Sequence, residues 1–145
     1  MFVIDQVLPP NLGISGLEGT MTEEEKLIQQ MAHRFAKEVM RPIGAQLDKM
    51  TPEEVIAEGS PLYTYLQQVV DSGLLDLSAI AEMTNEQKSR MIPIIFEEFG
   101  WGDSGLAILT IASSFPSFVA LMTGNAELIE KFAGKLGCWV ATQPD

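Results

Sequence analysis

Helix-capping residues recur along this chain, and they constrain its fold more than any other feature. Thr22 and Thr84 are each followed three residues later by an acid or amide, Glu25 and Gln87. In such a capping box the threonine hydroxyl and the later side chain each accept a backbone N–H at the start of a helix. Two further helices are predicted to start at Thr51 and Ser60. Each of these capping residues is followed directly by a proline, which is tolerated in the first turn of a helix. The chain is therefore expected to be mainly helical.

Apolar residues recur at helical spacing after each predicted start. The first predicted inward face is Leu27, Ile28, Met31, Phe35, Val39 and Ile43; the second is Leu62, Tyr65, Leu66, Val69 and Val70; the third is Met91, Ile94, Ile95 and Phe99. Pro42 lacks a backbone N–H, so a kink or break is expected near Val39 to Arg41. The helices from Ser60 and Thr84 are predicted to end near Gly73 and Phe99.

The segment from Leu106 to Met122 is almost entirely apolar or small. With Asp103 or Ser104 as its cap, it is predicted to form the buried central helix of a bundle, kinked at Pro116. Its hydroxyl residues and its proline argue against a transmembrane helix. No basic region precedes the apolar residues at the N-terminus, so no secretory signal is expected. A last short helix, 126–133, is predicted to follow a cap at Asn125.

The chain ends with a different pattern, GCWVATQPD. Residues 138–142 are rich in strand-forming types, and Gln143 and Pro144 close them. A single strand leaves its backbone hydrogen-bonding groups unpaired. We therefore expect a cut at a domain boundary, with 1–21 as an N-terminal arm, 22–136 as a helical domain and 137–145 as the first strand of a domain not contained in the sequence.

Charge and composition exclude several classes of function. The formal net charge of −11 argues against a nucleic-acid-binding face. His33 is the only histidine and Cys138 the only cysteine, so an internal disulfide, a typical zinc site and a Ser-His-Asp triad are not expected. No glycine-rich phosphate-binding motif is present. The single cysteine fits a reducing compartment such as the cytoplasm.

Five segments, in order, resemble the N-terminal region of acyl-CoA dehydrogenases. They are 33–43 with Asp48 (HRFAKEVMRPI), 66–77 with its DSGLL, 96–100 with Asp103 (FEEFG), 124–127 with Lys131 and Phe132 (GNAE), and 141–145 (ATQPD). The last resembles the Thr-Glu-Pro signature that begins the family's β-domain. Because order and spacing both agree from about Thr22 to Asp145, the chain is identified as a member of this family.

The sequence also departs from the family pattern. The Pro-Glu-x-x-Gly-Gly loop is missing around Asp76 to Asn85, and Gln143 stands where the family has glutamate. The loop at 134–137 is short. These differences indicate a divergent member and leave its substrate and its activity open.

The resemblance implies an all-α fold, an orthogonal or up-down helical bundle, carrying one terminal β-strand that belongs to an absent β-domain. In the family a middle β-domain and a C-terminal four-helix bundle follow. A carboxylate removes the α-proton of an acyl-CoA thioester, and the β-hydride passes to FAD. The family's usual base lies in the C-terminal bundle, so no catalytic residue is expected in this chain, which should be inactive alone. Glu97 and Glu98 are expected to be structural or solvent-facing.

Two sets of site residues follow from the resemblance. In the family, a strand contacts the flavin, and the matching residues here are Trp139, Ala141 and Thr142. The alternative is an ordinary strand with a buried Trp139. Ile111, Ala112 and Phe115 map to the inner end of the acyl pocket, although they would equally suit the core of a buried helix. If Phe115 points into the pocket, a short or cyclic acyl group is expected.

The family further implies an acyl-CoA substrate, an electron-transfer flavoprotein or similar acceptor, and a homo-oligomer, either a tetramer or a dimer. The expected location is the cytoplasm, or the mitochondrial matrix in a eukaryote. Two alternatives stay open. One is a non-enzymatic, acidic helical interaction module, whose last strand joins a partner's sheet. The other is one subunit of a split or heteromeric dehydrogenase.

Overall fold

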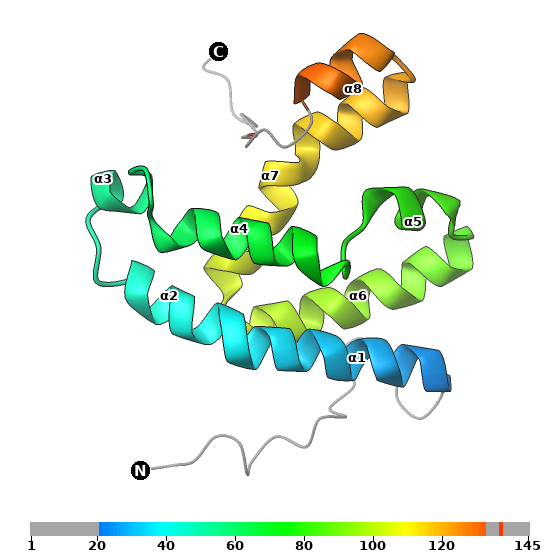
Figure 1. Cartoon of the computed structure of the whole chain (residues 1–145). Coiled ribbons are helices and arrows are strands. Elements are labelled where there is room, and N and C mark those ends of the chain that lie inside the picture. The colour runs from blue at the N-terminus through cyan, green and yellow to red at the C-terminus, as the bar shows by residue number, and fades with distance from the viewer. Residues whose placement is uncertain (1–20, 133–136, 138–145) are drawn as a thin grey trace, which may run out of the picture.

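The computed structural model describes residues 21–132 and Gly137, and these residues form a helical assembly (Figure 1). Its elements are α1 (Glu23–Phe35), the π-helical segment η2 (Ala36–Met40), α2 (Arg41–Leu47), α3 (Pro52–Val55), α4 (Pro61–Ser72), α5 (Leu77–Glu82), α6 (Asn85–Gly102), α7 (Ser104–Thr123) and α8 (Ala126–Phe132). The all-α prediction is confirmed, and no strand occurs within the described residues. The predicted terminal strand lies outside them.

The predicted helix starts are confirmed. Thr22, Thr51 and Thr84 each form a complete capping box, and the Ser60 hydroxyl accepts the Leu62 N–H. The Asn125 side chain accepts two backbone N–H groups at the start of α8. Local hydrogen-bonding chemistry therefore determines where most of the helices begin.

A kink or break was expected near Val39 to Arg41, and the helix does not break there. The backbone stays helical through Pro42, and the residues before it form the π-helical segment η2 instead. A proline ring clashes with the carbonyl four residues earlier, and a π-helical segment is wider than an α-helical turn. We infer that η2 accommodates Pro42 without breaking the rod formed by α1, η2 and α2.

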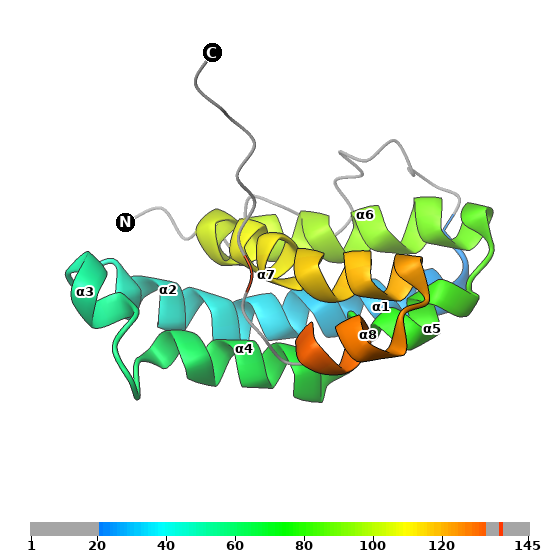
Figure 2. The same cartoon turned by 90° about the horizontal axis from the view of Figure 1, so that it is seen from above.

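The rod contacts α6 on one side and α4 on another, as the view from above shows (Figure 2). The core between these helices and the start of α7 consists of Ala32, Ala36, Met40, Leu62, Tyr65, Val69, Ile95, Phe99, Leu106 and Ala107. Small side chains let the helices approach closely, since a Cβ at Gly102 would lie 2.8 Å from the Cβ of Ala36. Phe35 stacks on Phe99 with ring centroids 5.4 Å apart.

Burial corrects part of the predicted helix faces. The inward face of α6 is confirmed, since its four predicted residues are all buried. On the rod the buried line is Ala32, Ala36 and Met40, whereas Leu27 and Met31 are exposed. The prediction followed the larger apolar side chains, but close helix packing placed the small Ala32 and Ala36 on the buried line together with Met40. Val70, predicted to face inward on α4, is also exposed.

The position of α7 is the main correction to the fold prediction. It was expected to be the buried central helix, but it leaves the other helices near its N-terminus and rises to one side, where α8 packs against it (Figure 1). Only Leu106, Ala107, Thr110 and Ala120 are buried along its length. The helix continues through Pro116 and ends at Gly124, whose left-handed φ of 64° suits a residue without a side chain.

Candidate functional site

The N-terminus of α7 is held against the rod. The Asp103 carboxylate accepts the Leu106 N–H at 2.8 Å and caps the helix. The same carboxylate lies over Gly44 of α2, where an added Cβ would come within 2.1 Å of Oδ2. A glycine at position 44 is therefore needed to leave room for the cap that starts α7.

Buried hydroxyl groups fix the rotation of α7 about its axis. The hydroxyls of Tyr65 and Thr110 are 2.5 Å apart, and the Tyr65 hydroxyl also donates to the carbonyl of Leu106 at 3.2 Å. Burial raises the pKa of Tyr65 to about 12; the hydrogen bond with Thr110 opposes this rise, and the nearby charge of Asp103 adds to it. Tyr65 is thus neutral at physiological pH and ties one face of α7 to α4.

The opposite face of α7 carries a line of exposed and half-buried apolar side chains, here named the α7 stripe. Its members are Ile108, Ile111, Phe115, Phe118 and Met122, spaced by three and four residues. Ile108 is 68% exposed, Phe118 47% and Met122 74%. Val119 and Leu121 beside it are also exposed, and no ionisable side chain occurs between Asp103 and Glu127. Contiguous apolar surface of this kind is typical of an interface or a ligand-binding wall.

The comparisons with known proteins agree with the helical architecture. A family profile described as "Acyl-CoA dehydrogenase, N-terminal domain" matches residues 22–137, about four fifths of the chain. The chain belongs to the acyl-CoA dehydrogenase family. Neither the curated proteins nor the solved structures gave a match.

The α7 stripe contains two of the three residues predicted to line the acyl pocket of this acyl-CoA dehydrogenase domain. Ile111 is 42% exposed and Phe115 is half-buried, both on the stripe, while Ala112 is half-buried one position round the helix. Ile108, one turn before Ile111, shares their face and was not singled out from the sequence. The spacing of three residues between Ile108 and Ile111 was the signal that pointed to it.

The residues predicted to contact the flavin, Trp139, Ala141 and Thr142, lie outside the described residues. The segment that carries them follows Gly137, which packs against the middle of α7: an added Cβ there would lie 2.0 Å from Cγ of Pro116. Ser117 donates to the carbonyl of Phe132 at 3.0 Å and holds the end of α8 to the same part of α7. Gly137, the residue before this segment, thus lies beside the helix that bears the stripe.

A cluster of polar and aromatic side chains joins α1 to α6. His33 Nδ1 lies 2.7 Å from Oε2 of Glu98, whose side chain is only 10% exposed. The ring of Trp101 contacts His33 at 4.4 Å between centroids and the guanidinium of Arg41 at 4.0 Å. Glu98 is therefore structural, one of the two roles expected for it, while the pairing with His33 was not predicted.

An ion pair holds the first turn of α1 against α6. Arg90 donates to both carboxylate oxygens of Glu25, at 2.5 and 2.9 Å. These hydrogen bonds lower the pKa of Glu25 to about 2, against the opposing effect of burial. Among residues 21–132 and Gly137, no group of three His, Cys, Asp or Glu side chains is arranged to hold a metal ion.

Among the described residues, α7 is long and apolar enough to cross a membrane by length and composition alone. Its most apolar 18-residue window has a mean hydropathy of 1.8, and 22% of that window is buried. The core helices of many water-soluble proteins meet the same criterion. The tie between Tyr65 and Thr110, together with the packing of α8, shows that part of its surface is used for contacts within the protein.

Proposed function

We propose that this domain is the helical part of a flavin-dependent enzyme that dehydrogenates an acyl-CoA thioester between its α and β carbons. The single observation that carries the proposal is the α7 stripe: a line of uncharged, apolar side chains, most of them exposed, on a helix that family membership associates with the acyl pocket. An acyl chain is apolar and gains about 0.8 kcal/mol per buried CH₂, so it matches a wall without charges.

The role of this chain's own residues in the reaction is to bind and to exclude water. Ile108, Ile111 and Phe115 would pack against the acyl chain, while the N-terminal half of α7 is anchored by Tyr65 and Asp103. A wall held by the scaffold positions the reacting carbons better than a mobile one. Bound FAD would accept the hydride, and the base would come from a region beyond this sequence.

The remaining expectations belong to the same proposal. The domain would be followed by a β-domain that begins at about Gly137 and by a helical bundle. The complete enzyme would be a homo-oligomer, tetrameric or dimeric, that passes electrons to an electron-transfer flavoprotein or a similar acceptor. It would act in the cytoplasm, or in the mitochondrial matrix of a eukaryote.

The test begins with the protein encoded by the complete reading frame. Its visible spectrum should show flavin absorption bands, and these should bleach when an acyl-CoA substrate is added without oxygen. A colourless full-length protein that cannot be reconstituted with FAD would contradict the proposal. Flavin binding only after co-expression with a second chain would instead favour a split or heteromeric dehydrogenase.

A matched pair of variants tests the stripe itself. Ile108→Asp puts a charge on the proposed acyl wall, whereas Ile56→Asp puts the same charge on an isoleucine that is equally exposed, 67% against 68%, but lies far from it in sequence. We expect Ile108→Asp to raise KM for the acyl-CoA at least tenfold and Ile56→Asp to leave it unchanged. Equal kinetics for the two variants would remove the stripe from the substrate site.

The stripe also supports the non-enzymatic alternative, because a helix with apolar residues at intervals of three and four can pack into a partner's groove. Under this alternative the full-length protein binds no flavin, and Ile108→Asp abolishes association with the partner protein. The flavin spectrum therefore separates the two functions before any partner is known.

A further inference from the structure

The rotation of α7 about its axis decides which of its side chains can meet an acyl chain. No ionisable side chain occurs between Asp103 and Glu127, so the helix has no charged face of its own to orient it. Successive residues of an α-helix lie about 100° apart around the axis. A rotation by one residue would therefore bring Ala112 or Thr110 to the place of Ile111 and would change the shape of the α7 stripe.

Three buried oxygen atoms fix this rotation from the side of α4. The hydroxyl oxygens of Tyr65 and Thr110 are 2.5 Å apart, and the carbonyl oxygen of Leu106 lies 3.2 Å from the first and 2.8 Å from the second. Tyr65 is 0% exposed and Thr110 only 6%, so water does not reach them to replace a lost partner. A turn of α7 that separated these atoms would leave a buried hydroxyl unpaired, which is costly.

Tyr65 is itself held in place by the core. It lies on α4, and its ring is 6.3 Å from that of Phe35 on the rod, measured between centroids. It also belongs to the cluster of buried side chains that joins α4 to the rod and to α6. Because these contacts do not involve α7, Tyr65 would not follow α7 if that helix turned. Its hydroxyl is therefore a fixed point for the helix.

The α7 stripe lies away from this fixed point. Thr110 is two residues from Ile108 and five from Phe115, which corresponds to about 160° and 140° around the helix. Ile108 is 68% exposed, whereas Thr110 is buried against α4. Tyr65 thus contacts α7 from behind the proposed acyl wall.

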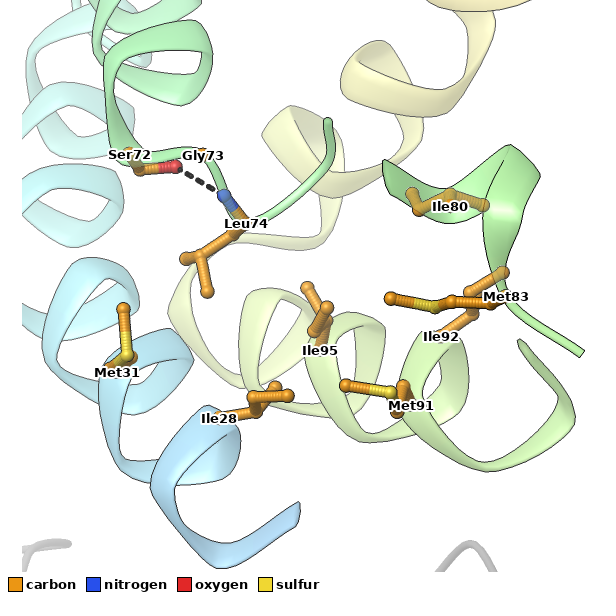
Figure 3. A pocket seen from close by; sticks show the side chains of 10 residues that line it. All are labelled: Ile28, Met31, Ser72, Gly73, Leu74, Ile80, Met83, Met91, Ile92 and Ile95. Carbon is orange, nitrogen blue, oxygen red and sulfur yellow. Dashed lines mark hydrogen bonds between the residues drawn. The ribbon is translucent and has the colours of Figure 1, made fainter. Parts of the chain in front are cut away.

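A separate apolar pocket between α1, α5 and α6 offers a site for comparison (Figure 3). Its volume is about 200 Å³, and its lining includes Met31 of α1, Met83 after α5 and Met91 of α6. Residues 72–74, at the end of α4, also line it, and none of its described lining residues belongs to α7. The rotation of α7 would therefore not affect an acyl chain bound in this pocket.

We propose that Tyr65 is a positioning residue for acyl-chain selectivity. From the side of α7 that faces away from the substrate, its hydroxyl holds the rotation that presents Ile108, Ile111 and Phe115 as the acyl wall. This role rests on the proposed function, since it requires the α7 stripe to meet the acyl chain. If Tyr65 only stabilised the domain, its loss would reduce the amount of folded enzyme and leave the preference among acyl chains unchanged.

The test uses the complete enzyme and two pairs of variants. Tyr65→Phe removes only the hydroxyl, and Tyr63→Phe makes the same change on the same helix, at an exposed tyrosine whose hydroxyl donates to the carbonyl of Ile56. Thr110→Val removes the partner hydroxyl, whereas Thr110→Ser retains it. Rates are measured per bound flavin with acyl-CoA substrates from C4 to C12, so that unfolded enzyme is not counted.

Selectivity is the kcat/KM for the preferred chain divided by that for a chain four carbons longer. We expect Tyr65→Phe and Thr110→Val to lower this ratio about fivefold or more and to raise KM for the preferred chain, because a misplaced wall positions the substrate poorly. Tyr63→Phe and Thr110→Ser should keep the ratio. An equal loss of activity at every chain length would overturn the proposal. If Tyr65→Phe yields no flavin-bound enzyme, Thr110→Val decides alone.

Met83→Trp, which places a large ring in the pocket of Figure 3, separates the role of Tyr65 from the proposed function. We expect it to leave the selectivity ratio unchanged. If it alters the ratio and Tyr65→Phe does not, the acyl chain lies in the pocket, and the role of Tyr65 is overturned while the dehydrogenase function stands. If the unsubstituted enzyme binds no flavin or oxidises none of these acyl-CoA substrates, the proposed function is wrong and the role of Tyr65 falls with it.

Discussion

Gly102 lets α6 approach η2 closely, because it has a hydrogen atom where other residues carry a Cβ. A Cβ at this position would lie 2.8 Å from Cβ and 3.0 Å from Cα of Ala36, and a backbone atom cannot move aside cheaply. We predict that Gly102→Ala destabilises the domain by about 1–3 kcal/mol, as overpacked cores do. The free energy of unfolding, measured with urea, is the observable.

Gly100 provides the control for this prediction in the same helix. An added Cβ there meets nothing within 4 Å. Gly100→Ala should leave stability unchanged or raise it by up to about 1 kcal/mol, since alanine is the better helix former. If both variants lose the same stability, the close approach of α6 to η2 is not the cause.

The ion pair between Glu25 and Arg90 predicts a pH dependence of stability. The pKa of Glu25 is about 2 in the folded chain, against 4.5 as its ordinary value. The depressed pKa contributes stability above pH 4.5, and this contribution is lost as the pH falls toward 2. At 1.36 kcal/mol per pKa unit, the loss should be about 3 kcal/mol, and the Glu25 side chain is only 8% exposed, so solvent screens the pair little.

Glu25→Gln should remove this part of the pH dependence, measured as unfolding free energy between pH 6 and pH 2. Glu24, an exposed neighbour in the same helical turn, supplies the control variant Glu24→Gln, which should retain it. An unchanged profile for Glu25→Gln would show that the carboxylate is not held by Arg90 in solution.

At this scale the sequence predicts local contacts and misses distant ones. Thr22, Thr84 and Asn125 were identified as caps because a cap and its partners lie within three residues of each other. The pairs formed by Glu25 with Arg90 and by His33 with Glu98 each span 65 residues. Nothing in the local pattern specifies such a pair, because it depends on how α1 packs on α6.

At the scale of elements, α7 shows that an apolar helix need not be buried: almost all of its residues are apolar or small, but only four are buried. Within the isolated chain, replacing an exposed member of the stripe should cost little stability. We predict that Ile108→Ser and Met122→Ser each change the free energy of unfolding by less than about 0.5 kcal/mol, as substitutions at exposed sites usually do. Leu106→Ala should cost about 2–4 kcal/mol, since Leu106 is 4% exposed and part of the core.

Urea unfolding of the chain 1–145 gives all three values. Losses of 2 kcal/mol or more for the stripe variants would mean that the stripe is core, which was the alternative interpretation of Ile111, Ala112 and Phe115. Small losses together with altered behaviour of the full-length enzyme would mean that the stripe meets the acyl chain or another domain.

The same helix explains why its burial was predicted wrongly. A segment that is apolar all round has no polar face to indicate which side meets solvent, so periodicity locates the helix without orienting it. Its orientation comes from Tyr65, Thr110 and Asp103, whose contacts were not visible in the sequence. On the rod the opposite case occurs, since the closely packed Ala32 and Ala36 carry a weaker hydrophobic signal than the exposed Leu27.

At the scale of the whole molecule, the described residues carry two separate apolar surfaces. The pocket between α1, α5 and α6 lies beside the start of the chain, and the α7 stripe lies on the helix that Gly137 contacts. The second is proposed to face substrate. The family and the helical fold were predictable because they rest on caps, spacing and ordered motifs, whereas the exposure of the stripe depends on tertiary packing.

The size of Phe115 leads to a prediction for the complete enzyme. An aromatic ring on the acyl wall fills space that a longer chain would otherwise use, so the wild-type enzyme should prefer short or cyclic acyl groups. Phe115→Ala removes that volume and should shift the optimum of kcat/KM by at least two carbons toward longer chains, at about 0.8 kcal/mol per added CH₂. The measurement is the chain-length profile from C4 to C12 acyl-CoA.

Phe118→Ala is the matched control, since it removes the same ring from the same stripe about one turn further along α7. It should keep the wild-type chain-length optimum, because Phe118 lies beyond the residues proposed to meet the acyl group. An unchanged profile for Phe115→Ala would remove this residue from the pocket. A shift of equal size in both variants would mean that α7 moves as a whole when the stripe is weakened, and chain length would then be set by the position of the helix rather than by the volume of one ring.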